Sequence, residues 1–150
     1  MRALRLENGE LVLHRNHSKP SLQEDYCLVQ IHSAALNRRD QWICDGAYPN
    51  IQNATLGSDG CGTVVEGSYD AIERDVVICP SLNWGKNQAF QSKDYTILGM
   101  PEDGTFADYC AVPSCTLCPK PEHLSHQQAA ALPLAGLTAW RALCTQGNHG

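Results

Sequence analysis

The stretch at residues 56–67 reads LGSDGCGTVVEG and combines four glycines with Ser58 and Asp59, a pattern that could hold a phosphate. A phosphate loop needs a strand before the glycines and a helix after them, because the backbone amides and the helix dipole then face the anion. Here a loop-like segment comes first, and a β-branched run at 63–66 follows. This order excludes a phosphate loop and predicts a tight glycine loop at 56–62 that leads into a strand.

A second group of residues has the types that bind metals. Cys110, Cys115 and Cys118 are spaced C-x4-C-x2-C, and His123 and His126 follow them, so a zinc site is one interpretation. Against it, the first cysteine lies in the strand-like FADYCAV, prolines interrupt the rest, and the histidines surround a helix start. We interpret most of the eight cysteines as reduced core residues of a reducing compartment.

Alternating apolar residues predict the strands that must position these side chains. The first fifteen residues alternate on both sides of Asn8-Gly9, which predicts a hairpin. Four further strands are expected, at 25–36, 62–66, 75–79 and 106–112.

Helices are expected mainly near the end of the chain. A short helix is predicted at 38–45, ended by a glycine. Ser125 and Gln128 form a capping box for a helix that runs to Pro133, and a second helix is expected from about 135 to 144. The predicted fold class is therefore mainly β with short helices.

Composition narrows the possible partners. The chain has 150 residues, 43% apolar and 18% charged, which suits one globular domain with its own core. The net charge of −5 and the lack of a basic stripe make nucleic acid and anionic membrane surfaces poor partners. Without a long apolar run or a signal-peptide pattern, a cytoplasmic setting is expected.

Four segments taken in order carry a family resemblance: LNRRDQWICDGAYP, LGSDGCGTVVEG, GTFADYCAVP and KPEHLSHQQAAALPLAGLTAWRAL. Together they resemble the N-terminal portion of the medium-chain dehydrogenase/reductase superfamily, nearest to zinc-type alcohol dehydrogenases and quinone-reductase-like members. The resemblance implies that residues 1–150 form a GroES-like, partly open β-barrel with C-terminal helices, on the substrate side of an active site. It places NAD(P)(H) in a Rossmann domain that these residues lack, so the chain alone is not expected to bind the cofactor.

The metal positions of the family are altered here. Zinc-dependent members place their catalytic ligands at the positions of Asn37, Ser58 and Leu134. A catalytic zinc needs about three nitrogen, sulfur or carboxylate ligands, which these residues cannot supply. The stretch at 81–104 also lacks the four cysteines of a structural zinc lobe. We therefore expect no zinc, and the aromatic residues of that stretch either cover part of the cleft or anchor a surface loop.

The resemblance implies a polar, metal-free site. Its candidate catalytic residues are Tyr48 and Asn37, as donors that stabilise negative charge on a substrate oxygen. The other implied residues lie in the substrate cleft, namely Asp40, Ser58 and Asp59, or at the cofactor edge, namely Arg38 and Thr138.

Each of these residues also has a structural interpretation. Asn37 and Asp40 could cap the helix at 38–45, and Thr138 could bond back to a helix carbonyl. Tyr48 could pack at the barrel mouth, while the remaining polar residues could be turn or solvated side chains.

The implied reaction of the complete enzyme is hydride transfer involving a carbonyl, a quinone or an activated alkene, with a small molecule as the partner. The isolated chain would be inactive, because half of the active site is missing. One alternative is a stand-alone GroES-like module for binding or assembly without enzymatic activity. Another is a metal-storage or sensing domain that uses the cysteines.

Overall fold

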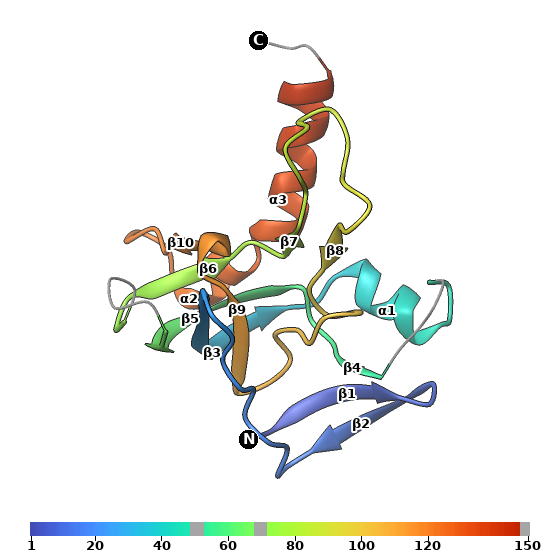
Figure 1. Cartoon of the computed structure of the whole chain (residues 1–150), viewed down its shortest axis with the longest axis vertical. Helices are drawn as coiled ribbons and strands as arrows, with labels where there is room; N and C mark the ends of the chain where they lie inside the picture. The colour runs from blue at the N-terminus through green and yellow to red at the C-terminus, as the bar shows by residue number, and fades with distance from the viewer. Residues whose placement is uncertain (49–52, 68–71, 148–150) are drawn as a thin grey trace.

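The computed structural model describes residues 1–48, 53–67 and 72–147, and within them it is mainly β (Figure 1). One sheet contains β1 (Ala3–Glu7), β2 (Glu10–His14) and β4 (Ala54–Thr55) in the order β2-β1-β4. β1 and β2 form the predicted hairpin, and Asn8 and Gly9 take positive φ angles of 52° and 87° in its turn. The segment at 47–56 is expected to be a loop, but Ala54 and Thr55 in it form β4 because they pair with β1, and its residues 49–52 lie outside the described residues. The predicted final turn includes 148–150, which also lie outside them.

The larger sheet is antiparallel throughout and has the order β10-β6-β5-β3-β9. Its five members lie far apart in the sequence and are β3 (Tyr26–Ala35), β5 (Asp59–Glu66), β6 (Asp75–Ile78), β9 (Tyr109–Pro113) and β10 (Leu117–Pro119). A small third sheet pairs β7 (Ser81–Leu82) with β8 (Thr96–Ile97). The five-stranded sheet positions the candidate site, because the end of the β3–β5 pairing where Ala35 faces Asp59 lies next to the polar residues Asn37 and Ser58.

Three apolar clusters hold the described residues together, and the smallest packs Ala129 and Ala130 against Cys61 of β5. The main cluster is formed by side chains of the five-stranded sheet, with Leu82 and Leu98 packed among them. It includes Cys27, Val64 and Val112, all fully buried. The second joins Leu6 to Ile43, so it packs the small sheet against α1 (Arg38–Cys44). Of the eight cysteines, all of which are free, three are buried, two are half-buried and three are exposed, namely Cys115, Cys118 and Cys144. The interpretation covered most of the cysteines, and these three exposed ones are not core residues.

The first C-terminal helix begins where the capping box predicts. Ser125 accepts a hydrogen bond from the Gln128 amide at 3.2 Å, and the Gln128 side chain accepts one from the Ser125 amide at 3.0 Å. α2 (His126–Ala130) packs on the large sheet, and α3 (Pro133–Trp140) continues as a π-helix, η3 (Arg141–Gln146). A 3-10 turn, η2 (Ser114–Thr116), links β9 to β10. α3 has no buried residue and extends away from the barrel in Figure 1.

The glycine stretch differs from the expected loop. β5 begins at Asp59, so only residues 56–58 precede it, because Asp59 and Gly60 already pair with the end of β3. The predicted close approach is present: a Cβ on Gly62 would collide with the Gln30 carbonyl, and Gly57 has a φ of +95°. Among the described residues, no helix is both long and apolar enough to cross a membrane.

Candidate functional site

Three distant segments meet at the Asp59 carboxylate. Asn37, at the junction of β3 and α1, donates from Nδ2 to Oδ2 of Asp59 at 3.0 Å. The backbone amide of Leu134, in the first turn of α3, donates to Oδ1 at 2.8 Å. Asp59 itself is 1% exposed at the start of β5. One buried carboxylate thus joins Asn37 and Leu134, which occupy two of the positions where zinc-dependent members of the family have metal ligands.

The Asp59 side chain also takes the place of an N-cap residue for α3. Leu132 precedes α3 and provides no side-chain hydrogen bond to its first turn, so the free amides there need another acceptor. The Asp59 carboxylate is that acceptor for Leu134, and its negative charge suits a helix N-terminus. Burial raises the pKa of Asp59, although the hydrogen bonds from Asn37 and Leu134 oppose this shift.

Asn37 and Asp40 begin α1 as their structural interpretation predicted. Asn37 is the N-cap residue, and its backbone amide donates to Oδ2 of Asp40 at 2.8 Å. Asp40 is buried, its Oδ1 has no hydrogen-bond partner among the described residues, and burial raises its pKa. Capping does not remove Asn37 from the site, because its side chain also contacts Asp59.

Ser58 and Arg39 form a buried cluster beneath the glycine stretch. Ser58 is 0% exposed, and its hydroxyl donates to the Leu98 carbonyl at 2.8 Å. The Arg39 guanidinium donates to the Ser58 hydroxyl at 3.1 Å and to the Leu98 and Met100 carbonyls at 3.0 and 2.6 Å. Burial lowers the pKa of Arg39, whose Cζ lies 5.2 Å from the centre of the Tyr48 ring.

Sequence reasoning named the neighbouring Arg38 and missed Arg39. Arg38 is exposed, whereas Arg39 is buried and ties α1 to the segment at 98–100. The signal was the helix period: Arg39 lies four residues before the buried Ile43, so both belong to the same inward face. Half-buried Tyr48 packs beside this cluster, as its structural interpretation predicted.

Thr138 lies in a pocket between α3 and the loop that follows β7. The pocket measures about 340 Å³, and its lining includes Trp84, Tyr95, Leu134 and Arg141. Arg141 lies 4.3 Å above the Trp84 ring and donates to two carbonyls of the loop, so the loop is docked on the helix. The Thr138 hydroxyl is exposed and donates back to the Leu134 carbonyl at 2.7 Å, but its oxygen can still accept a hydrogen bond.

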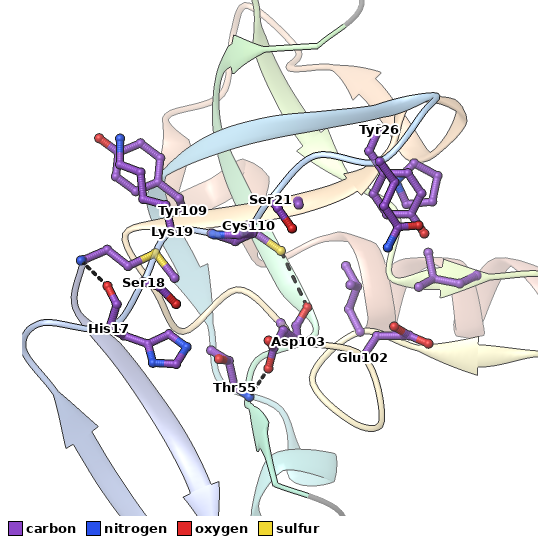
Figure 2. Close-up of a pocket in the computed structure, with 18 residues that line it drawn as sticks. His17, Ser18, Lys19, Ser21, Tyr26, Thr55, Glu102, Asp103, Tyr109 and Cys110 are labelled. Carbon is purple, nitrogen blue, oxygen red and sulfur yellow. Dashed lines mark hydrogen bonds between the residues drawn. The ribbon is translucent and has the colours of Figure 1, made fainter.

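A second pocket, of about 370 Å³, lies on another side of the barrel (Figure 2). His17, Lys19, Asp103 and Tyr109 are among its lining residues, and none of the predicted site residues lines it. Its one thiol, Cys110, is fully buried with a pKa raised to about 12, mainly by desolvation. That thiol is a poor nucleophile. The pocket at Thr138 is the better candidate because it contains Thr138, a residue that the family resemblance implies, and Leu134, which contacts Asp59.

The residues at the family's zinc positions do not fit a metal. The Asn37 amide donates to Asp59, the Ser58 hydroxyl donates to a carbonyl, and the Leu134 side chain has no donor atom. The cysteine site considered from the sequence is not assembled either, since within the described ranges the group of three metal-binding side chains is His32, Asp75 and His126.

Residues 23–122 match the alcohol dehydrogenase GroES-like domain. The chain belongs to this family. The zinc-type alcohol dehydrogenase-like protein YogA of Leptosphaeria maculans is 35% identical over 147 residues, which cover 88% of this chain and 41% of YogA. The trans-enoyl reductase tndF of Aspergillus flavipes is 34% identical over 122 residues, covering 80% of this chain and 33% of that protein.

Solved structures confirm the GroES-like fold. A crystal structure of an NAD-dependent alcohol dehydrogenase matches with a TM-score of 0.85 and 32% identity, over 97% of this chain and 47% of that chain. The resemblance to medium-chain dehydrogenases/reductases is therefore confirmed. The chain spans 41% or less of the length of the two curated relatives named above.

Proposed function

We propose that this chain is the substrate-side domain of a zinc-independent, NAD(P)-dependent oxidoreductase that acts on a carbonyl, a quinone or an activated alkene. The observation that carries the proposal is the hydrogen-bonded cluster at Asp59, because it fills the family's metal position with protein contacts. Similarity to an oxidoreductase described as a trans-enoyl reductase supports an activated alkene as the substrate class. The partner is then a small molecule in the cytoplasm, not nucleic acid or a membrane.

The residues of this chain position the substrate and stabilise charge on its oxygen. When bound, the nicotinamide supplies or accepts the hydride. Asp59 fixes Asn37 and the first turn of α3, and the pocket beside Thr138 holds the substrate. The amide donor of Asn37 already faces Asp59 and, at 3.5 Å, the Ala35 carbonyl, so of the two donors that the family resemblance implies we assign the oxyanion role to Tyr48. Tyr48 lies beside Arg39 and does not line the pocket at Thr138, so the substrate must extend out of that pocket to reach it.

The cofactor edge is assigned to Arg38 and Thr138. The exposed guanidinium of Arg38 is free to approach a pyrophosphate, and the Thr138 oxygen can accept a hydrogen bond from a nicotinamide amide. The nicotinamide cofactor is expected to be held mainly by a Rossmann domain, so residues 1–150 alone should not turn over substrate.

Hydride transfer by the natural full-length protein tests this function. NADH or NADPH consumption should occur with an α,β-unsaturated carbonyl, a quinone or an aldehyde, and a chelator should leave the rate unchanged. Tyr48→Phe should lower kcat by about 100-fold, the usual loss on removing an oxyanion donor. Tyr26→Phe is the matched control, because Tyr26 lines the other pocket. Turnover that a chelator abolishes and zinc restores, while Tm stays unchanged, would exclude the zinc-independent mechanism.

A further inference from the structure

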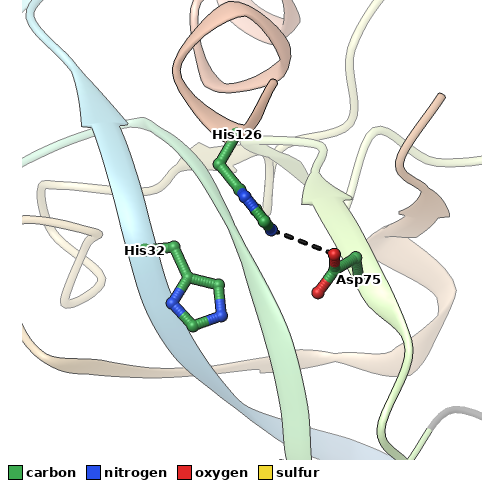
Figure 3. Close-up of side chains that lie close together, drawn as sticks. All are labelled: His32, Asp75 and His126. Atoms are coloured by element: carbon green, nitrogen blue, oxygen red, sulfur yellow. Dashed lines mark hydrogen bonds and ion pairs between the residues drawn. The ribbon is translucent and has the colours of Figure 1, made fainter. Parts of the chain in front are cut away.

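Two histidines and an aspartate from three different elements meet on the outer side of the large sheet (Figure 3). His32 comes from β3, Asp75 is the first residue of β6, and His126 is the first residue of α2. One ligand atom from each lies within 4.8 Å of the others, and Nε2 of His126 is 3.0 Å from Oδ2 of Asp75. The two imidazole rings are 4.8 Å apart, centre to centre.

Thr63 holds two members of this group in place. Its hydroxyl donates to Oδ1 of Asp75 at 2.7 Å and lies 2.8 Å from Nε2 of His32. Because a hydroxyl has only one proton, Nε2 of His32 is the donor in the second contact. The hydrogen bond from Thr63, followed by the influence of His126, lowers the pKa of Asp75, so its carboxylate is ionised at neutral pH. Hydrogen bonds of this kind, from a residue that does not itself bind the metal, orient metal ligands in proteins.

We propose that His32, Asp75 and His126 form a surface site for a divalent transition-metal ion, with Zn²⁺ as the preferred occupant. Two imidazoles and one carboxylate are a donor set that zinc accepts, and the exposed side leaves a further position for water. Ligand atoms about 2.1 Å from a tetrahedral ion lie about 3.4 Å apart, so small side-chain rotations close the observed spacing. An ion bound at Nε2 of His32 moves that nitrogen's proton to Nδ1 and ends its hydrogen bond to Thr63, so Thr63 then orients the site through Asp75. The ion also displaces the proton shared by His126 and Asp75.

This site lies outside the cluster at Asp59 and has a structural role. An ion there would link β3 and β6 to the start of α2, and so fasten the C-terminal helices to the barrel. The inference does not depend on the proposed hydride transfer, because the site contains none of the residues assigned to that reaction. Its readouts are binding and thermal stability, which remain measurable in a protein without turnover.

Zinc titration of the full-length protein tests the site. Calorimetry and equilibrium dialysis should give one Zn²⁺ per chain, and Zn²⁺ should raise Tm. His126→Ala and His32→Gln should each abolish stoichiometric binding, whereas His123→Ala is the matched control, an exposed histidine close to α2 but outside the group. Thr63→Val keeps all three ligands and should weaken binding by about 10- to 100-fold, the range typical of outer contacts.

Three results would overturn the proposal. One is stoichiometric zinc that persists in the double variant His32→Gln/His126→Ala, and another is zinc that disappears with Cys115→Ser/Cys118→Ser. The third is no saturable binding by a wild-type protein that melts cooperatively. Melting curves recorded without metal show whether each variant folds, and His32→Gln keeps the test valid if His126→Ala weakens α2.

Discussion

Asp59 is buried and charged, so the chain's stability should depend on pH through this residue. Burial raises its pKa in the folded state, so the folded chain binds this proton more tightly than the unfolded chain does. The free energy of unfolding should therefore fall as pH rises from the unfolded pKa, about 4, through the higher folded value. Asp59→Asn should flatten that fall, because an amide does not titrate in this range.

Urea unfolding at a series of pH values measures this effect. Asp94→Asn, at an exposed position, serves as the control and should follow the wild-type profile. Asp40 remains in all three proteins with its own raised pKa, but its repulsion of Asp59 is absent from Asp59→Asn, so the difference between profiles includes that interaction. Parallel profiles for the wild type and Asp59→Asn would show that the Asp59 carboxylate does not titrate differently in the two states.

Ser58 should contribute to stability. Its hydroxyl is fully buried between the Leu98 carbonyl and the Arg39 guanidinium. Ser58→Ala leaves one donor of that guanidinium with fewer acceptors, so we expect a loss of about 1–3 kcal/mol in the free energy of unfolding. Chemical denaturation measures the loss, with the exposed Ser18→Ala as the control. A change within about 0.5 kcal/mol would mean that water or a rearranged Arg39 replaces the hydroxyl.

At the scale of elements, two glycine substitutions should have opposite effects. In β5, a Cβ on Gly62 would collide with the Gln30 carbonyl of the neighbouring strand, so Gly62→Ala should destabilise the fold by about 1–3 kcal/mol. In α3, nothing lies within 4 Å of a Cβ on Gly136, so Gly136→Ala should stabilise it by about 0.5–1 kcal/mol. Thermal melts compare the two, and a stabilising Gly62→Ala would contradict the close strand packing.

Elements that depend on neighbouring residues were predicted well from the sequence. The start of β5, which depends on pairing with a distant strand, was not. The turn at Asn8-Gly9 and the capping box at Ser125 depend on neighbouring residues, and both are confirmed. β5 starts earlier than expected because Asp59 and Gly60, both poor strand formers, gain partners on β3. Helix α3 likewise begins at Pro133 instead of about Ala135, since proline is well suited to the first helical position.

At the scale of the whole molecule, the candidate site was only partly predictable. The family positions pointed to Asn37, Asp59 and Leu134, but no sequence pattern predicts that one carboxylate would hold the other two. Arg39 and the docking of the 81–104 loop on α3 depend on packing across the fold. The group at His32, Asp75 and His126 has no local motif either, because only the strand pairing and the position of α2 bring it together.

The strand order of the large sheet also determines how the chain must fold as it leaves the ribosome. β3 can pair with β5 once Glu66 has been made, but its other partner, β9, ends only at Pro113. At about 5–20 residues per second, roughly 2–10 s of synthesis separate the two events. During that interval the nascent chain exposes an open edge on β3, and the main cluster lacks Val112. Early chaperone contact would protect that edge from pairing with other nascent chains.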